Sequence, residues 1–220
     1  LDGSSAASDV YKRQVLDISS SMLADDFLPN RLEAVKETAM NFIYNREEDR
    51  IGILVFAGES FIQCPLTIDK SILKSLISEI KVASKEYDGT AIGMAIANGT
   101  NRFRSSDVES KVMILLSDGS NNSGEIDPIT AAELASQFGI KIYTIGAGTD
   151  QAYTKIPGRG LIVNEIDEAT LKKIANVTGG EYFRATDIKA LESIYLKIDE
   201  LERSEIEINE YTLYKELYGW

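Results

Sequence analysis

The chain has 220 residues, of which 44% are hydrophobic, and carries a formal net charge of −12. This length and composition suit one globular domain with a sizeable core, and the charge disfavours nucleic acid and anionic lipid surfaces as partners. The absence of histidine excludes Ser-His-Asp and Cys-His catalysis and every zinc site built on imidazole. The single cysteine, Cys64, cannot form an internal disulfide, and we expect it to be buried and structural.

The first fourteen residues, LDGSSAASDVYKRQ, are polar and aperiodic and run directly into a hydrophobic strand. The six residues DVYKRQ are encoded by the codons GAT GTG TAT AAG AGA CAG, which match a transposon end used in sequencing-library preparation. We therefore expect residues 1–14 to be a non-native, adapter-derived tail, with a native disordered tail as the alternative. Sequencing the source DNA across this junction distinguishes the two.

Strand and helix patterns then alternate along the chain. The predicted strands are short apolar runs, at 15–19, 51–56, 60–66, 112–116, 140–145 and 181–185. The predicted helices carry apolar residues at helical spacing, at 31–44, 72–80 and 91–103, and after the N-capping residues Asp127, Asp167 and Asp187. A glycine-containing loop is expected from about 147 to 160.

This alternation predicts an α/β fold, with a mostly parallel central sheet between two layers of helices, in a three-layer Rossmann-like arrangement. Runs 51–56 and 60–66 read as a hairpin, and Pro65 places the second of them at an antiparallel edge, because proline cannot donate to a sheet. The most hydrophobic run, 112–116, is expected near the centre. One domain is predicted over residues 15–202.

The last segment, 203–220, is expected to be a tail. Its final ten residues are rich in aromatic side chains, namely Tyr211, Tyr214, Tyr218 and Trp220. Aromatic residues gather at membrane interfaces, so the tail is a candidate juxtamembrane segment, and packing on the domain is the alternative. The sequence has no run of about 18 apolar residues, and we expect no membrane span within it.

Oxygen donors follow three predicted strands or turns that should meet at one edge of the sheet. They are Asp17, Ser19 and Ser21 in LDISSSM, Thr90 in DGTAIG, and Asp118 in LLSDG. The carboxyl ends of parallel strands meet at the ligand-binding edge of such folds. Two carboxylates and three hydroxyls form a donor set that suits Mg²⁺ or Mn²⁺ and leaves a position open for an incoming acid. Alone, the first cluster could be a helix cap and turn.

These three motifs, in this order, resemble the metal-ion-dependent adhesion site of von Willebrand factor type A domains. The resemblance covers roughly residues 15–202 and implies that Asp17, Ser19, Ser21, Thr90 and Asp118 are the metal site. The family usually has glycine between the two serines, where this chain has Ser20. Glycine adopts backbone angles that serine resists. We therefore expect Ser20 to lower the metal affinity modestly, and metal binding to be retained. Asp25 and Asp26 are read as acids of a first helical turn or as solvated charges, with shaping of the ligand rim as the alternative, and Asn121 and Asn122 as residues of a loop that borders the metal.

Longer stretches, among them MLADDFLPNRLEAVK, DRIGILVFAGESFIQCPLT and TGGEYFRATD, resemble the BatA-type aerotolerance proteins of bacteria. The resemblance implies a domain anchored in the inner membrane by segments outside this sequence, and facing the periplasm. It also implies a role beside other Bat proteins and a MoxR-type AAA+ ATPase in envelope or stress-related complexes.

The leading hypothesis is a binding module, not an enzyme, in which a partner's Asp or Glu completes the metal shell. One alternative is a scaffold domain with a vestigial metal site. The other is a Mg²⁺-dependent phosphohydrolase with Asp17 as nucleophile. Against the hydrolase, the position two residues after Asp17 is Ser19 rather than a second acid, and no lysine is clearly placed to hold a phosphate.

Overall fold

The computed structural model describes residues 10–46, 49–103, 108, 110–149, 153–156, 158, 160–163 and 166–218, and for residues 154, 162 and 204–218 it describes the backbone only. Within these residues, a six-stranded sheet has the strand order β3-β2-β1-β4-β5-β8. The strands are β1 (Val10–Asp17), β2 (Arg50–Phe56), β3 (Ser60–Thr67), β4 (Ser110–Ser117), β5 (Ile140–Ala147) and β8 (Tyr182–Ala185).

The pairings confirm the expected fold class. Strands β2, β1, β4, β5 and β8 run parallel to one another, and β3 pairs antiparallel with β2 at the edge. Pro65 lies in this edge strand, as predicted from its missing N–H group. The predicted central strand, β4, lies between β1 and β5 in the interior of the sheet. Cys64 is buried, as expected.

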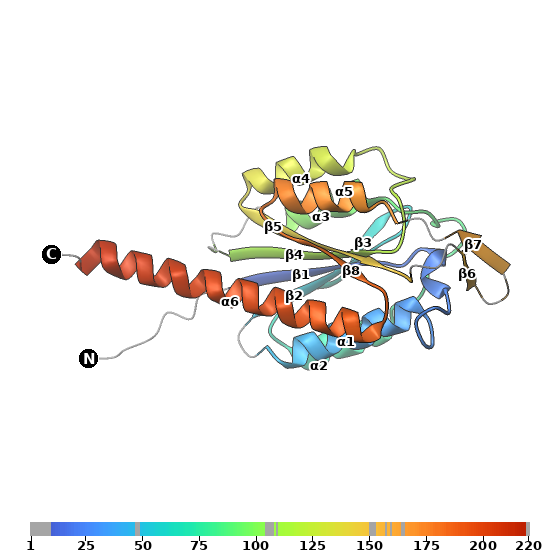
Figure 1. The fold of residues 1–220 in the computed structure, drawn as a ribbon, viewed down its shortest axis with the longest axis horizontal. Helices are drawn as coiled ribbons and strands as arrows, with labels where there is room; N and C mark the ends of the chain where they lie inside the picture. The colour runs from blue at the N-terminus through green and yellow to red at the C-terminus, as the bar shows by residue number, and fades with distance from the viewer. Residues whose placement is uncertain are drawn as a thin grey trace.

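Helices cover both faces of the sheet (Figure 1). On one face lie α1 (Arg31–Tyr44), α2 (Lys70–Ser78) and α6 (Ile188–Tyr218); on the other lie α3 (Ile92–Phe103), α4 (Pro128–Gln137) and α5 (Glu168–Val177). Asp127 and Asp167 cap α4 and α5 through hydrogen bonds from the backbone N–H groups of Thr130 and Thr170. The Asp187 carboxylate likewise accepts from Ala190 in the first turn of α6.

The core is divided by the sheet into two clusters, because successive side chains of a strand point to opposite faces. In β4, Val112, Ile114 and Leu116 face the side of α1, α2 and α6. Met113 and Leu115 face the side of α3, α4 and α5. Both sets are buried, which explains why this strand is an uninterrupted apolar run.

The first strand begins earlier than the sequence indicated. We expected it to start at Val15, with residues 1–14 forming a tail, but β1 starts at Val10 and pairs in register with β2 and β4. Lys12, Arg13 and Gln14 are buried in it. A polar segment was not recognised as a strand because its side chains lack the apolar pattern of the rest of the sheet. The adapter origin of residues 1–14 stays a prediction that the source DNA tests.

A second, two-stranded sheet overlaps the segment 147–160 that we expected to be a loop, and its second strand continues beyond that segment. Strands β6 (Tyr153–Ile156) and β7 (Gly160–Val163) form an antiparallel pair beside the 3-10 helix η1 (Ser20–Leu23) (Figure 1). The Asp25 N–H donates to the Lys155 carbonyl at 3.1 Å and joins the hairpin to the segment that follows η1. Strands of four residues between glycines carry too weak a pattern to be predicted from sequence.

The last helix, α6, is longer than expected. Its backbone continues to Tyr218, through most of the segment that we expected to be a tail, and it projects beyond the body of the domain (Figure 1). The aromatic side chains of this segment lie outside the described residues. Within the part of the chain that the structure describes, no helix is both long and apolar enough to cross a membrane.

Candidate metal centre

The site begins with Asp17, the last residue of β1, which is fully buried. Its Oδ1 accepts a hydrogen bond from the backbone N–H of Ser19 at 2.8 Å, and its Oδ2 accepts one from the hydroxyl of Ser117 at 2.7 Å. Ser117 ends the neighbouring parallel strand β4. One carboxylate oxygen is therefore held by the backbone that follows β1 and the other by the end of β4, and each keeps a lone pair for another ligand.

Three further predicted donors form a chain of contacts next to Asp17. The hydroxyl of Ser21 donates to Oδ1 of Asp118 at 2.7 Å, and the hydroxyls of Ser19 and Ser21 lie 2.9 Å apart. Since the only hydroxyl proton of Ser21 points to Asp118, Ser19 donates to Ser21. Four of the five predicted site residues thus converge at the carboxyl ends of β1 and β4.

The fifth predicted residue, Thr90, lies in the turn before α3 and is buried. Its Oγ1 approaches Gly119, at 3.6 Å from where a Cβ on that glycine would stand. The turn is held from the loop after β4, because the Thr90 N–H donates to Oδ1 of Asn122 at 2.9 Å and the Ile92 N–H donates to Oδ1 of Asn121 at 2.8 Å. The two asparagines, which we read as residues of a loop that borders the metal, therefore position the Thr90 turn.

Ser20, which stands where the family usually has glycine, is not strained. No non-glycine residue among those described has a positive φ, so this serine avoids the left-handed backbone that we expected to cost metal affinity. Ser20 instead begins the 3-10 helix η1, and its N–H donates to Oδ1 of Asp88 at 2.8 Å. The backbone of Ser20 therefore gives no reason to expect that cost, and retained metal binding stays a prediction.

Two residues that the sequence analysis did not assign to the site are part of it. Arg31, the first residue of α1, is buried, and its Nη1 donates to Oδ2 of Asp118 at 2.8 Å. Its Nε and Nη2 donate to the two oxygens of Asp26, at 2.7 and 2.6 Å. Asp26 was expected to be a solvated or first-turn acid, but its side chain is only 6% exposed. A positively charged residue in the first turn of a helix is unfavourable, because the helix dipole is positive at that end. The position of Arg31 at the start of α1 was therefore the sequence signal that could have pointed to a special role.

Burial dominates the electrostatics of the two candidate carboxylate ligands. Desolvation, together with the charge of Asp118, raises the pKa of Asp17 to about 7 despite the hydrogen bonds from Ser19 and Ser117. Desolvation also raises the pKa of Asp118, and the neighbouring Arg31 partly offsets this rise. Raised pKa values of both acids, in the absence of a metal ion, are what we expect of a site that binds a cation.

The donor set fits a small, hard cation. Among the described residues, no group of three or more Asp, Glu, His or Cys side chains is placed to hold a metal, so a site here must combine carboxylates with hydroxyls. Asp17, Asp118, Ser19, Ser21 and Thr90 supply this combination and contain only oxygen. Such a set suits Mg²⁺ or Mn²⁺ and not a soft metal, which would select sulfur or imidazole.

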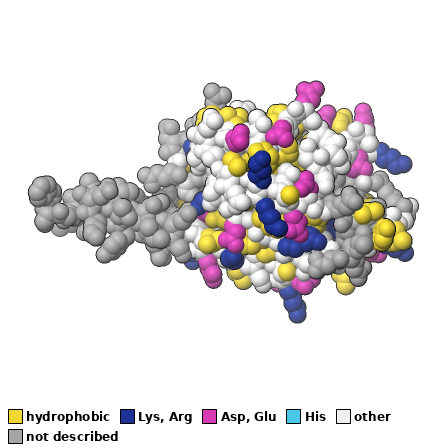
Figure 2. Space-filling view, turned by 45° about the horizontal axis from the view of Figure 1, so that its top comes forward, with side chains coloured by type: hydrophobic (Ala, Val, Ile, Leu, Met, Phe, Trp, Pro, Cys, Tyr) yellow, Lys and Arg dark blue, Asp and Glu magenta, His cyan; other side chains and the backbone are white. Residues whose placement is uncertain are grey.

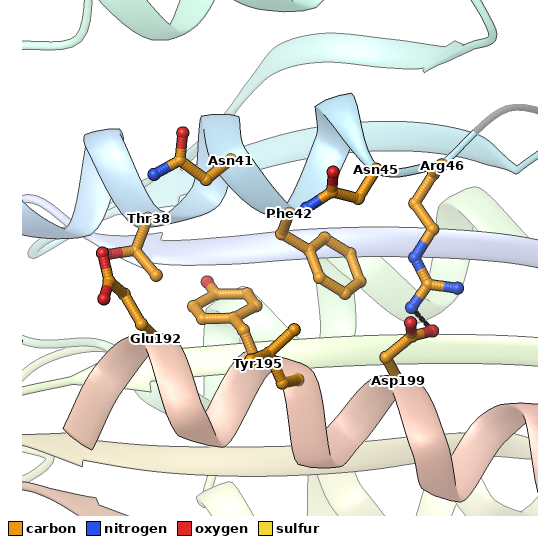
Figure 3. Close-up of a pocket in the computed structure, with 9 residues that line it drawn as sticks. Thr38, Asn41, Phe42, Asn45, Arg46, Glu192, Tyr195 and Asp199 are labelled. Atoms are coloured by element: carbon orange, nitrogen blue, oxygen red, sulfur yellow. Dashed lines mark ion pairs between the residues drawn. The ribbon is translucent and has the colours of Figure 1, made fainter. Parts of the chain in front are cut away.

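A separate pocket of about 210 Å³ lies between α1 and α6 (Figure 3). Phe42 and Tyr195 point toward one another inside it, and their ring centroids are 5.2 Å apart. An ion pair between Arg46 and Asp199 closes one end. The Tyr195 hydroxyl donates to Oε1 of Gln14 at 2.9 Å, so the pocket floor is tied to the sheet. None of the candidate metal ligands lines this pocket.

Together, the doubly covered parallel sheet and the oxygen cluster at its carboxyl edge define an α/β domain with a candidate cation site. The profile of the von Willebrand factor type A domain matches residues 14–197, and the chain belongs to this family. The hydrogen bonds described above bring Asp17, Ser19, Ser21 and Asp118 together at the carboxyl edge of this fold, and their role as metal ligands stays a prediction.

Several known proteins resemble the chain over most of its length. The structure of BatB from Bacteroides thetaiotaomicron is 31% identical, covers 88% of this chain and 99% of its own, and superposes with a TM-score of 0.76. An aerotolerance-related membrane protein from Bacteroides fragilis is 32% identical, with coverages of 87% and 97% and a TM-score of 0.76. These neighbours confirm the predicted resemblance to the aerotolerance family.

Curated relatives are longer than the chain. An uncharacterised protein from Borreliella burgdorferi is 31% identical over 214 residues, which are 92% of this chain and 62% of that protein. A UPF0353 protein from Mycolicibacterium gilvum is 29% identical over 196 residues, with coverages of 84% and 58%. The chain thus spans about three-fifths of the length of these relatives.

Proximal thread matrix protein 1 of the mussel byssus shares the fold at 16% identity, with coverages of 86% and 47% and a TM-score of 0.65.

Proposed function

We propose that this domain is a metal-dependent protein–protein interaction module and not an enzyme. Mg²⁺, or Mn²⁺, binds to Asp17, Ser19, Ser21, Thr90 and Asp118, and an Asp or Glu of a partner protein completes its coordination. The observation that carries the proposal is the 2.7 Å contact between Ser21 Oγ and Asp118 Oδ1, which joins donors 97 residues apart at one sheet edge. The mussel protein named above has a zinc-occupied site of the corresponding kind, which supports metal binding by this fold.

The charge of the domain favours binding of an acidic partner only when a metal ion occupies the site. The chain carries a net charge of −12, so an acidic partner is repelled in general. On the face shown in Figure 2, acidic and basic side chains are interspersed and no large basic area attracts an anion. A divalent cation whose charge is balanced by Asp17 and Asp118 stays electrophilic, and would give a carboxylate a local point of attachment. The same net charge supports our view that nucleic acid is not a partner.

We prefer this module to the phosphohydrolase. A phosphohydrolase that uses Asp17 as nucleophile would be expected to carry a second acid two residues later, where this chain has Ser19, whose hydroxyl lies 2.9 Å from that of Ser21. Ser20, in place of the usual glycine, was the reason to consider a vestigial site, and Ser20 has no positive φ.

The neighbours support a setting in the bacterial envelope. One of them is described as an aerotolerance-related membrane protein and another as BatB. We propose that the domain is anchored in the inner membrane by segments outside this sequence and faces the periplasm. Other Bat proteins and a MoxR-type AAA+ ATPase system are the proposed partners.

Calorimetric titration of Mg²⁺ and Mn²⁺ tests the metal site. We expect saturable one-site binding by the wild type and none by Asp118→Ala. The matched control is Asp127→Ala, which removes an exposed acid at the cap of α4 and should leave metal binding unchanged. Peptides selected from a displayed random library in Mg²⁺ should contain an acid, be released by EDTA and fail to bind Asp118→Ala. Equal metal binding by Asp118→Ala and the wild type would refute the proposed site.

A further inference from the structure

Arg31 occupies one oxygen of a candidate metal ligand. Its Nη1 lies 2.8 Å from Oδ2 of Asp118, while Oδ1 of the same carboxylate faces the hydroxyl of Ser21 at 2.7 Å. The Asp118 side chain is completely buried, and that of Arg31 is 1% exposed. Water therefore cannot easily replace the arginine, and the two oxygens of Asp118 have different surroundings.

The arginine is itself fixed on its other side. Its Nε and Nη2 bind both oxygens of Asp26 in the planar, paired geometry that only a guanidinium provides. Asp26 Oδ2 also accepts from the N–H of Thr149, in the loop after β5, and the Thr149 carbonyl accepts from Nη2 of Arg184 at 3.1 Å. This line of contacts prevents Arg31 from swinging away from Asp118.

We propose that Arg31 is a positioning residue that sets the metal selectivity of the site, by restricting Asp118 to one-oxygen coordination. Ca²⁺ takes about six to eight oxygens and readily binds a carboxylate through both of its oxygens, whereas Mg²⁺ requires a smaller, near-octahedral shell. Holding Oδ2 of Asp118 removes the second oxygen and so disfavours Ca²⁺. The inference rests on the proposed function, because it concerns the same site.

The other candidate carboxylate ligand, Asp17, is also arranged to bind a metal through one oxygen. Oδ1 and Oδ2 of Asp17 accept hydrogen bonds from Ser19 and Ser117 at opposite ends of the group. Two-oxygen coordination by Asp17 would lengthen or break one of these bonds. Both carboxylates are therefore arranged to offer single oxygens, but only Asp118 is restricted by a charged group, whose removal should have the larger effect.

Calorimetric titration of Mg²⁺ and Ca²⁺ into the wild type and Arg31→Met tests the inference. We expect the ratio of Mg²⁺ to Ca²⁺ affinity to fall about 10-fold in Arg31→Met, in the range seen when partners of metal ligands are removed. Arg31→Lys should lie between the two, since one ammonium cannot bind both acids as a guanidinium does. Lys36→Met removes another buried cation of α1, which contacts Glu33 and the Ile80 carbonyl, and should leave the ratio unchanged.

The outcomes separate this inference from the proposed function. Wild-type binding of Mg²⁺ with an unchanged ratio in Arg31→Met, or an equal loss of both cations, would show that Arg31 is only structural. If Arg31→Met does not fold, Asp26→Asn loosens the same arginine, and the ratio should shift in the same direction; no shift would overturn the inference. A wild type that binds neither cation would refute the proposed function and this inference together.

Discussion

The two ends of β1 bury polar side chains in opposite ways. At the carboxyl end, Asp17 accepts two hydrogen bonds, and the nearby Arg31 donates to two acids. At the amino end, Arg13 is 2% exposed and Gln14 is fully buried, yet Nε and Nη1 of the arginine and Nε2 of the glutamine have no hydrogen-bond partner. Burial of a polar group is expensive unless it is paired. Complete pairing at one end therefore indicates a site, and incomplete pairing at the other indicates a mismatch.

The neighbouring strand shows what the amino end of β1 ordinarily requires. Lys12, Arg13 and Gln14 pair with Val112, Met113 and Ile114 of β4. A strand buried on both faces of a parallel sheet is normally apolar, as β4 is. Residues 10–14 thus take the position of a central strand without its composition. Whether these residues are native to this fold stays a prediction that the source DNA tests.

The largest expected change in stability results from removal of Arg31, the paired arginine. Arg31→Met leaves Asp26 and Asp118 without their cation, and we expect it to lower the free energy of unfolding by about 3–5 kcal/mol. Urea unfolding followed by circular dichroism measures this change. A loss of less than about 1 kcal/mol would show that pairing at the carboxyl end contributes little, and would break the comparison between the two ends.

The next largest effect is a dependence of stability on pH, which arises from Asp17 at the carboxyl end of β1. In EDTA the folded chain holds the Asp17 proton up to about pH 7, whereas an unfolded aspartate with the ordinary pKa of 3.8 loses it earlier. The unfolded state then binds fewer protons, so the contribution of Asp17 to stability falls as pH rises, by about 1.4 kcal/mol per pH unit. Urea unfolding at pH 5, 6 and 7 should show this slope in the wild type relative to Asp17→Asn. Parallel curves for the two proteins would contradict it.

The sequence predicted most of the fold because the elements have strong local signals. The helix at 31–44 was predicted at the limits that α1 has, and Asp127 and Asp167 marked the starts of α4 and α5. The strand at 10–14 and the β6–β7 hairpin were missed, because buried charges and four-residue strands do not produce an apolar period.

The site was predictable only in part. Motif order was enough to bring Asp17, Ser21 and Asp118 to one sheet edge, since the carboxyl ends of parallel strands meet there. The roles of Asp26 and Arg31 depend on the path of the segment between η1 and α1, which is set by tertiary contacts. A local pattern does not contain that information, and an acid near a helix start is most often solvated.

The smallest effect should distinguish two adjacent residues within β1. Arg13→Met removes a guanidinium with unpartnered nitrogen atoms, whose pKa is lowered to about 10 by burial and the charge of Arg102. We expect it to raise the free energy of unfolding by about 1–3 kcal/mol, because the desolvation penalty disappears and an apolar chain remains. Lys12→Met is the matched control: the Lys12 ammonium contacts Asp49 at 2.6 Å, and its loss leaves this acid only a longer contact with Arg46 at 3.6 Å, so stability should fall. Urea unfolding of both variants measures the signs. Destabilisation by Arg13→Met equal to that by Lys12→Met would show that the arginine is accommodated, and that residues 10–14 fit this strand as well as a native sequence would.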